Sequence, residues 1–145
     1  MPYYPKSNIL FIHIPKTGGS VIENEIKQKE RQKLWSGLHN NILDKPYNTQ
    51  SLQHQFYRTL YKNRDILKIN FDNIKIFSIV RNPYNRIISD MLWWGIYHDK
   101  NNNFEKNPLP RIKKDFTPEQ VYDIIINSYI NRSDLDNHNE PQYKF

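Results

Sequence analysis

Two strand-like runs of apolar residues set the framework of the predicted fold. Residues 8–14 are nearly continuous in hydrophobic side chains, and residues 75–80 form a second run of the same kind. The first run is typical of a strand buried on both faces of a parallel sheet, and the second also predicts a strand. Each run is followed by turn residues and then by a stretch of helical composition. The pattern therefore predicts an α/β fold, a short parallel sheet flanked by helices and joined by right-handed crossovers.

Apolar residues at helical spacing predict four helices around these strands. The last begins with Thr117-Pro118-Glu119-Gln120, a sequence typical of a capping box. The helices are expected over residues 20–33, 51–64 and 83–97, and from residue 117 onward. Loops are expected at residues 36–50 and 99–114, the second a natural place for substrate specificity, and a polar tail at residues 132–145.

Composition favours one soluble domain spanning residues 1–145. Mean hydropathy is −0.85, and a chain of 145 residues can bury a modest core. The chain has no cysteine, which excludes disulfides and thiolate metal sites. No stretch approaches the ~18 apolar residues of a membrane span, and no signal-peptide pattern precedes the first strand. We therefore expect a cytoplasmic protein without a membrane partner.

The charge balance favours an anionic ligand. The net charge is +6 and the pI is about 9.4, which suits an anionic cofactor, an anionic glycan or nucleic acid. Basic residues are interspersed with acidic ones, as at residues 27–33, so these runs are better interpreted as solvated helix faces. No nucleic-acid-binding motif is present, and nucleic acid is not the expected partner.

The first strand ends in a turn with the chemistry of a phosphate site. A lysine, two hydroxyls and two glycines stand where a helix begins, so backbone N–H groups are available to an anion. The glycines allow the backbone to approach an oxygen closely. The nucleotide-binding pattern Gly-x-x-x-x-Gly-Lys-Ser/Thr is absent, so the turn is P-loop-like only. Its residues are Pro15, Lys16, Thr17, Gly18, Gly19 and Ser20.

The second strand ends in a segment that offers another anion site. Arg81 stands at the carboxyl end of the strand, where open α/β sheets bind ligands. Ser89 follows eight residues later, about two helical turns on. A guanidinium and a hydroxyl can grip a phosphate together. Two such sites in one chain indicate a ligand with two separated anionic groups.

Together, the two motifs resemble those of sulfotransferases that use 3′-phosphoadenosine 5′-phosphosulfate (PAPS). The match is to the branch with a Pro-Lys-Thr-Gly-Gly-Ser/Thr loop and an Arg-Asn-Pro-Tyr/Trp-x-Arg-x-x-Ser segment, which includes carbohydrate sulfotransferases. The resemblance implies PAPS as donor, adenosine 3′,5′-bisphosphate as product, and a hydroxyl acceptor, here expected on a glycan. It also implies that residues 15–20 hold the 5′-phosphate, with Lys16 stabilising the transfer, and that Arg81 and Ser89 hold the 3′-phosphate.

A general base must take the proton of the acceptor hydroxyl. His54 is the first candidate, because relatives often carry a histidine before the arginine-containing strand, and His39 is the second. A solvent-facing helical histidine is the competing interpretation of His54. His13 lies inside the first strand and is better interpreted as a hydrogen-bonded core residue. His138 begins a segment, residues 138–142, that resembles a His-x-x-Pro-Gln segment found late in carbohydrate sulfotransferases, although a mobile tail explains it equally well.

Three further residues have two interpretations each. Arg86 either assists phosphate binding or braces the loop through a carboxylate. Trp93 and Trp94 are better explained by core packing than by stacking on adenine or sugar. No set of histidines and carboxylates has metal-ligand spacing, so no metal is expected.

The length of the chain leaves alternatives open. Catalytic domains of the family are longer, and only about fifty residues follow Ser89 here. A truncated domain that binds the nucleotide without catalysis is therefore the main alternative. An ATP-dependent phosphotransferase is less favoured, because the Walker pattern and a strand-end aspartate for Mg²⁺ are missing. A homodimer that completes the site across its interface also agrees with the sequence.

Overall fold

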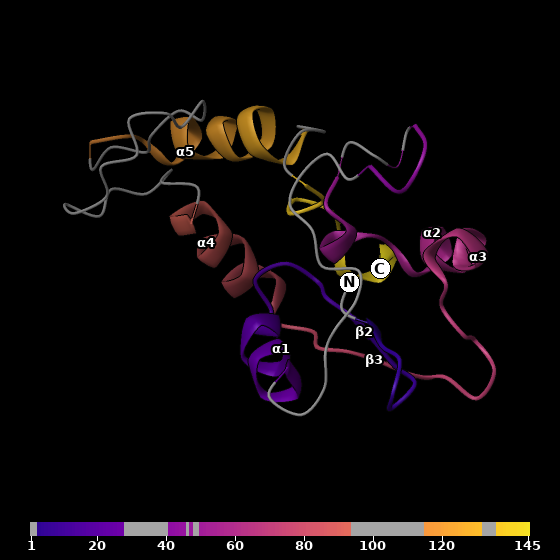
Figure 1. Cartoon of the computed structure of the whole chain (residues 1–145). Coiled ribbons are helices and arrows are strands. Elements are labelled where there is room, and N and C mark those ends of the chain that lie inside the picture. Colours follow the sequence, from indigo (N-terminus) through magenta and orange to yellow (C-terminus); the bar gives the residue numbers. More distant parts are fainter. Residues whose placement is uncertain (1–2, 28–40, 46, 48–49, 94–114, 132–135) are drawn as a thin grey trace.

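A small mixed sheet organises the fold (Figure 1). The computed structural model describes residues 3–27, 41–45, 47, 50–93, 115–131 and 136–145. The strands are β1 (Tyr3–Tyr4), β2 (Ile9–Ile12) and β3 (Lys75–Ser78), in the order β1-β2-β3. β2 pairs in parallel with β3, as predicted, whereas β1 pairs with β2 in the antiparallel sense. The sheet is thus mixed and not purely parallel.

The two predicted strands differ in burial. β2 is central, and Leu10, Phe11 and Ile12 are at most 4% exposed. β3 is the last strand in the sheet order, and Ile76 and Phe77 are 41% and 37% exposed. Burial of the first run is therefore as predicted, and the second run forms the predicted strand but is less covered, because it has one neighbour in the sheet.

Helices lie on both sides of the sheet in Figure 1. α1 (Gly19–Lys27) and α4 (Pro83–Trp93) lie on one side, and α2 (Tyr57–Lys62) and α3 (Arg64–Leu67) lie on the other. The main core forms where one face of β2 meets α2 and α3, and it includes Leu10, Ile12, Leu60 and Leu67. None of the helices in the described ranges has the length and apolar character that a membrane crossing requires.

The helix predicted over residues 51–64 is interrupted. A 3-10 turn, η2 (Leu52–His54), is followed by two extended residues, and α2 begins only at Tyr57. Gln55 explains the interruption: it is 1% exposed, and its amide donates to the backbone carbonyl of Tyr47 at 3.1 Å. Hydrogen bonding by this buried amide favours the extended backbone over a continuous helix. His54 therefore sits in a short turn rather than at the start of a helix.

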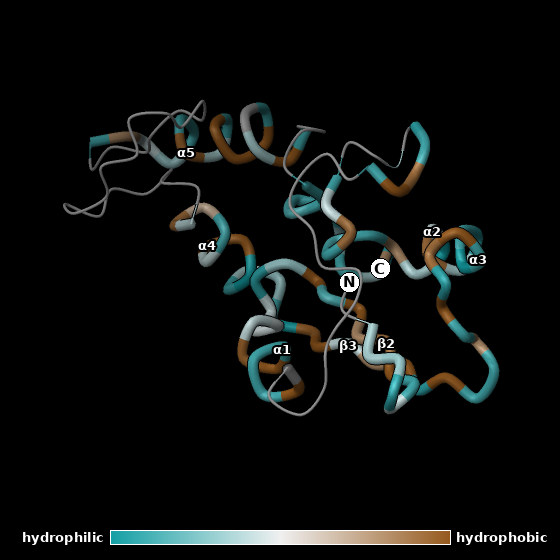
Figure 2. The backbone as a smooth tube through the Cα atoms, in the orientation of Figure 1, coloured by the Kyte–Doolittle hydropathy of each residue, from teal (hydrophilic) through white to brown (hydrophobic). Residues whose placement is uncertain are grey.

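A second hydrophobic cluster joins α4 to the last long helix. That helix comprises α5 (Pro118–Ile125) and a π-helical turn, η3 (Ile126–Ile130). Its predicted capping box is confirmed, since Thr117 and Gln120 exchange hydrogen bonds at 2.8 and 3.3 Å. Both α4 and α5 carry bands of hydrophobic and hydrophilic residues (Figure 2). Their apolar residues pack around the buried side chains of Met91 and Tyr129.

The segment after residue 135 corrects the prediction of a polar tail. Asp136 and Asn137 are only 8% and 4% exposed. The chain ends in a 3-10 turn, η4 (Gln142–Lys144), and Phe145 packs on Phe56 with ring centroids 4.9 Å apart. These polar residues form hydrogen bonds inside the protein. Composition alone does not distinguish such buried polar residues from solvated ones.

Adjacent residues of α3 test the position of the main core. Leu67 is 4% exposed, and its neighbour Ile66 is 57% exposed. We expect Leu67→Ala to lower the free energy of unfolding by about 2–5 kcal/mol, because it removes buried methyl groups and leaves a cavity. Ile66→Ala removes as many carbons from the surface and should cost less than about 1 kcal/mol. Equal losses in denaturant titrations of the two variants would contradict this core.

Candidate functional site

The turn after β2 contains two residues with a left-handed backbone conformation. Lys16 and Gly18 both have positive φ angles, 63° and 93°. Only Gly18 adopts such an angle without steric cost. The hydroxyl of Thr17 donates to the carbonyl of Ile14 at 2.8 Å, so it stabilises the turn itself. The turn then leads directly into α1, and the N-terminus of a helix is suited to an anion.

Gly19 has a different role, which is close packing against His13. A Cβ atom built on Gly19 would lie 2.4 Å from the His13 imidazole. No side chain fits there unless the ring moves, so the absence of a Cβ atom fixes how closely β2 and α1 approach. The Nδ1 atom of His13 lies 2.5 Å from the carboxylate of Glu23 on α1. His13 is thus buried and hydrogen-bonded, as the sequence favoured.

The segment after β3 places Arg81 just before α4 and Ser89 within that helix. Asn82 caps this helix, because its side-chain oxygen accepts from the backbone N–H groups of Tyr84 and Asn85 at 3.1 and 3.2 Å. The guanidinium of Arg81 donates to the carbonyl of Lys16 at 3.2 Å. The two predicted phosphate motifs are therefore in direct contact, although they lie 65 residues apart in sequence.

One cavity of about 370 Å³ brings nearly all of the predicted site residues together. Thr17 is the exception, since its side chain is not part of the lining. Four further residues line the same cavity: His13, Gln53, Trp93 and His138. The predicted residues that line it are Pro15, Lys16, Gly18, Gly19, Ser20, His54, Arg81 and Ser89.

Lys16 and Trp93 interact across this cavity. The Lys16 ammonium lies 4.4 Å from the centroid of the Trp93 ring, a cation–π contact. Burial lowers the pKa of Lys16, Asp90 partly offsets this effect, and Arg81 lowers it further. Trp93 is 62% exposed, so the prediction that it packs in the core is wrong. Its ring instead covers the lysine that the sequence assigned to the transfer step.

His54 is held by a buried carboxylate. Its Nδ1 atom lies 2.6 Å from Asp136, which also accepts from the Ser51 hydroxyl at 2.7 Å and from the Ser51 N–H at 2.6 Å. Burial lowers the pKa of His54 to about 4, although the Asp136 carboxylate partly offsets the effect. The pair is therefore a hydrogen bond from neutral imidazole and not an ion pair near pH 7. The Nε2 atom remains to accept a proton.

The carboxylate of Asp136 is stabilised in its charged form. Burial alone would raise its pKa, but the hydrogen bonds from His54 and Ser51 outweigh burial and lower it. Asp136 in turn orients the His54 ring, as carboxylates do for catalytic histidines. The solvent-facing interpretation of His54 is wrong, since the residue is 8% exposed.

Three imidazoles form a row, each with Nδ1 on a carboxylate. The centroid of the His54 ring lies 5.2 Å from that of His13 and 4.9 Å from that of His138. His138 Nδ1 lies 2.6 Å from Asp90, which is fully buried and also accepts from the Tyr129 hydroxyl. Burial raises the pKa of Tyr129, and the Asp90 charge raises it further, so the phenol stays protonated as a donor.

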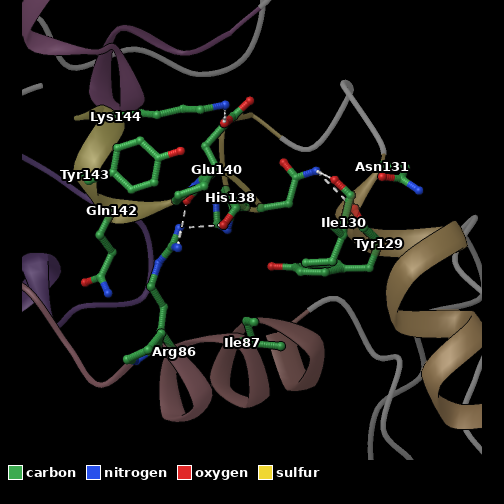
Figure 3. A pocket seen from close by; sticks show the side chains of 13 residues that line it. Arg86, Ile87, Tyr129, Ile130, Asn131, His138, Glu140, Gln142, Tyr143 and Lys144 are labelled. Carbon is green, nitrogen blue, oxygen red and sulfur yellow. Dashed lines mark hydrogen bonds and ion pairs between the residues drawn. The ribbon is translucent and has the colours of Figure 1, made fainter.

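Arg86 braces the site through backbone carbonyls rather than through a carboxylate. It is 5% exposed and donates to Pro15 at 2.9 Å, Glu140 at 2.9 Å and His138 at 2.6 Å. Figure 3 shows its side chain rising from α4 to the segment that carries His138 and Glu140. Arg86 therefore has the bracing role, one of the two considered from the sequence, but its partners are backbone carbonyls and not the expected carboxylate.

Sequence reasoning missed the carboxylates and one possible ligand group. His54, Asp136 and His138 have ligand atoms within 4.8 Å of one another, the kind of group that a metal ion needs. Sequence spacing does not reveal it, because His54 lies 82 residues from Asp136. Both histidines of this group already bond to carboxylates, His54 to Asp136 and His138 to Asp90. The only available signal was the faint match around His138.

Several sequence predictions fall outside the described residues. These are the alternative base His39, the second tryptophan Trp94 and the loop at residues 99–114. Residues 28–33 of the first predicted helix and residues 94–97 of the third also fall outside.

Comparison with known proteins identifies the family of this chain. The model of the sulfotransferase family matches residues 3–145, nearly the whole chain. The match includes the turn after β2, the segment on α4 and the C-terminal residues that complete the cavity. Searches of curated proteins and of solved structures gave no match. The chain belongs to the sulfotransferase family.

Proposed function

We propose that this sulfotransferase moves a sulfuryl group from PAPS to a hydroxyl, and that its acceptor is a carbohydrate. The observation that carries the proposal is the shared cavity. Lys16 and Ser20 from one phosphate motif line it together with Arg81 and Ser89 from the other. A nucleotide with separate 3′ and 5′ anionic groups needs two such sets of donors, close enough for a single nucleotide to contact both.

The donor set fits the two ends of that nucleotide. Backbone N–H groups at the start of α1 and the Ser20 hydroxyl would hold the 5′-phosphate, since a helix N-terminus favours anions. Arg81 and Ser89 would hold the 3′-phosphate through a guanidinium and a hydroxyl. The donor supplies the activated sulfuryl group, and when the bond between its sulfur and the 5′-phosphate oxygen breaks, the nucleotide leaves as adenosine 3′,5′-bisphosphate.

The residues of the cavity would divide the work of transfer as follows. The Nε2 atom of His54 accepts the proton of the acceptor hydroxyl as the new S–O bond forms. Asp136 keeps the ring oriented and stabilises the imidazolium that results. Lys16 stabilises the negative charge that develops on the leaving phosphate oxygen. Positioning and electrostatics do most of the catalysis, as in phosphoryl transfer.

Loss of either cationic ligand should weaken nucleotide binding. We expect Lys16→Ala and Arg81→Ala each to reduce the affinity for adenosine 3′,5′-bisphosphate by about tenfold to a hundredfold, because each removes a charge-assisted contact. Calorimetric titration measures this, with ATP as a competing ligand. Lys62→Ala, which removes a surface lysine outside the cavity, serves as the control for loss of positive charge. Unchanged affinity in both cavity variants would refute the proposed nucleotide site.

The low pKa of His54 predicts an unusual pH profile. Burial keeps the imidazole neutral, and therefore able to act as a base, until the pH falls through about 4. The rate constant kcat/KM should thus stay level through the range near pH 6.5 where an ordinary histidine becomes protonated. It should fall only at more acidic pH. Asp136, His138 and His13 face His54 and contribute to this profile.

The variant His54→Gln should lower kcat by about a hundredfold to ten-thousandfold. It should leave bisphosphate affinity within a few-fold of the original. A wild-type acidic limb near pH 6.5, or full activity in His54→Gln, would exclude His54 as the base.

A further inference from the structure

The His-x-x-Pro-Gln segment, residues 138–142, runs along the second phosphate motif and contacts it at three points. At one end, the Gln142 amide bonds to Arg81. In the middle, the carbonyls of His138 and Glu140 accept from Arg86. At the other end, the His138 ring bonds to Asp90, the residue after Ser89. The segment therefore spans the whole of the motif that begins at Arg81 and ends at Ser89.

The contact between Gln142 and Arg81 is specific to an amide side chain. The Gln142 oxygen accepts from the Arg81 N–H at 2.8 Å, and the Gln142 nitrogen donates to the Arg81 carbonyl at 2.7 Å. Both backbone groups of Arg81 are thus bound by one planar group, much as a neighbouring strand would bind them. A carboxylate of similar shape accepts but cannot donate, so glutamate does not replace glutamine here.

Arg81 needs such a support because the described residues hold it at few other points. The residue follows β3, the last strand in the sheet order, and its side chain is exposed. Its guanidinium makes one described hydrogen bond, to the Lys16 carbonyl at 3.2 Å. A long side chain on a loosely held backbone loses much freedom when it binds a phosphate. Holding the backbone in advance reduces that loss.

We infer that Gln142 is a positioning residue for the 3′-phosphate: it holds the Arg81 backbone so that the guanidinium is set to bind the phosphate that distinguishes the donor from other adenine nucleotides. This inference rests on the proposed function. Gln142 lies on the wall of a different cavity, of about 670 Å³, and not on that of the nucleotide cavity. Figure 3 shows it on the same segment as His138 and Glu140. It therefore acts on the nucleotide through Arg81.

The test compares two ligands that differ only in the 3′-phosphate. Adenosine 3′,5′-bisphosphate and adenosine 5′-phosphate are titrated calorimetrically into the full-length wild type and into Gln142→Ala. We expect Gln142→Ala to lose about tenfold in affinity for the bisphosphate, the worth of one to two hydrogen bonds. Its affinity for adenosine 5′-phosphate should not change, so the preference for the 3′-phosphate falls by the same factor. Tyr143→Ala, which alters the adjacent and 85% exposed residue, should behave as wild type.

The outcomes separate this inference from the proposed function. A wild type that binds both ligands equally contradicts the proposed nucleotide site, and the inference falls with it. A wild type that prefers the bisphosphate, beside a Gln142→Ala variant with the same preference, overturns the inference alone. Equal losses for both ligands also overturn it, because they indicate a general distortion.

A second variant keeps the test decisive if Gln142→Ala unfolds. Gln142→Asn retains the amide but is shorter by one methylene, so it should fold and still lose part of the preference for the bisphosphate. Unfolding of both variants in thermal melts would mean that Gln142 supports the fold and not the phosphate site.

Discussion

The guanidinium of Arg86 is the constraint on which the rest of the site depends. A buried charge is costly unless its donors are satisfied, and Arg86 directs them at three carbonyls from two distant segments. Pro15 belongs to the first phosphate motif, and His138 and Glu140 belong to the C-terminal segment. Since Arg86 itself stands within the second motif, one side chain joins all three parts of the cavity. Its removal would leave each carbonyl without this donor.

A shared scheme also connects the histidines of the cavity. Each of the three imidazoles presents Nδ1 to a carboxylate that is nearly inaccessible to solvent, and the carboxylates come from different elements. This arrangement fixes the orientation of each ring. The histidine that takes the proton in our proposal, His54, owes its neutral state to burial, and Asp136 counteracts that burial in part. The base is thus tuned by residues that no local motif contains.

The sequence predicted the parts that local chemistry determines. The β2 and β3 runs and the capping box at Thr117 depend on residues close together in the chain, and the structure brings the two predicted motifs to one cavity. The prediction of a continuous helix over residues 51–64 is wrong, because the buried amide of Gln55 bonds to Tyr47 where the backbone is extended. The prediction of a polar tail failed for a different reason: the partners of Asp136 and Gln142 lie more than sixty residues earlier, whereas the partner of Gln55 is only eight residues away. Composition shows that residues are polar but does not show which partners they hydrogen-bond to.

A crystal structure of the complex with adenosine 3′,5′-bisphosphate tests the central claim most directly. That claim is that the two motifs, held together by Arg86 and the C-terminal segment, bind the two ends of one nucleotide. We predict the 5′-phosphate against the turn at residues 15–20 and the 3′-phosphate within hydrogen-bond distance of Arg81 and Ser89. Nucleotide bound instead in the cavity beside Tyr129 and Tyr143, or with its two phosphates exchanged, would contradict the account.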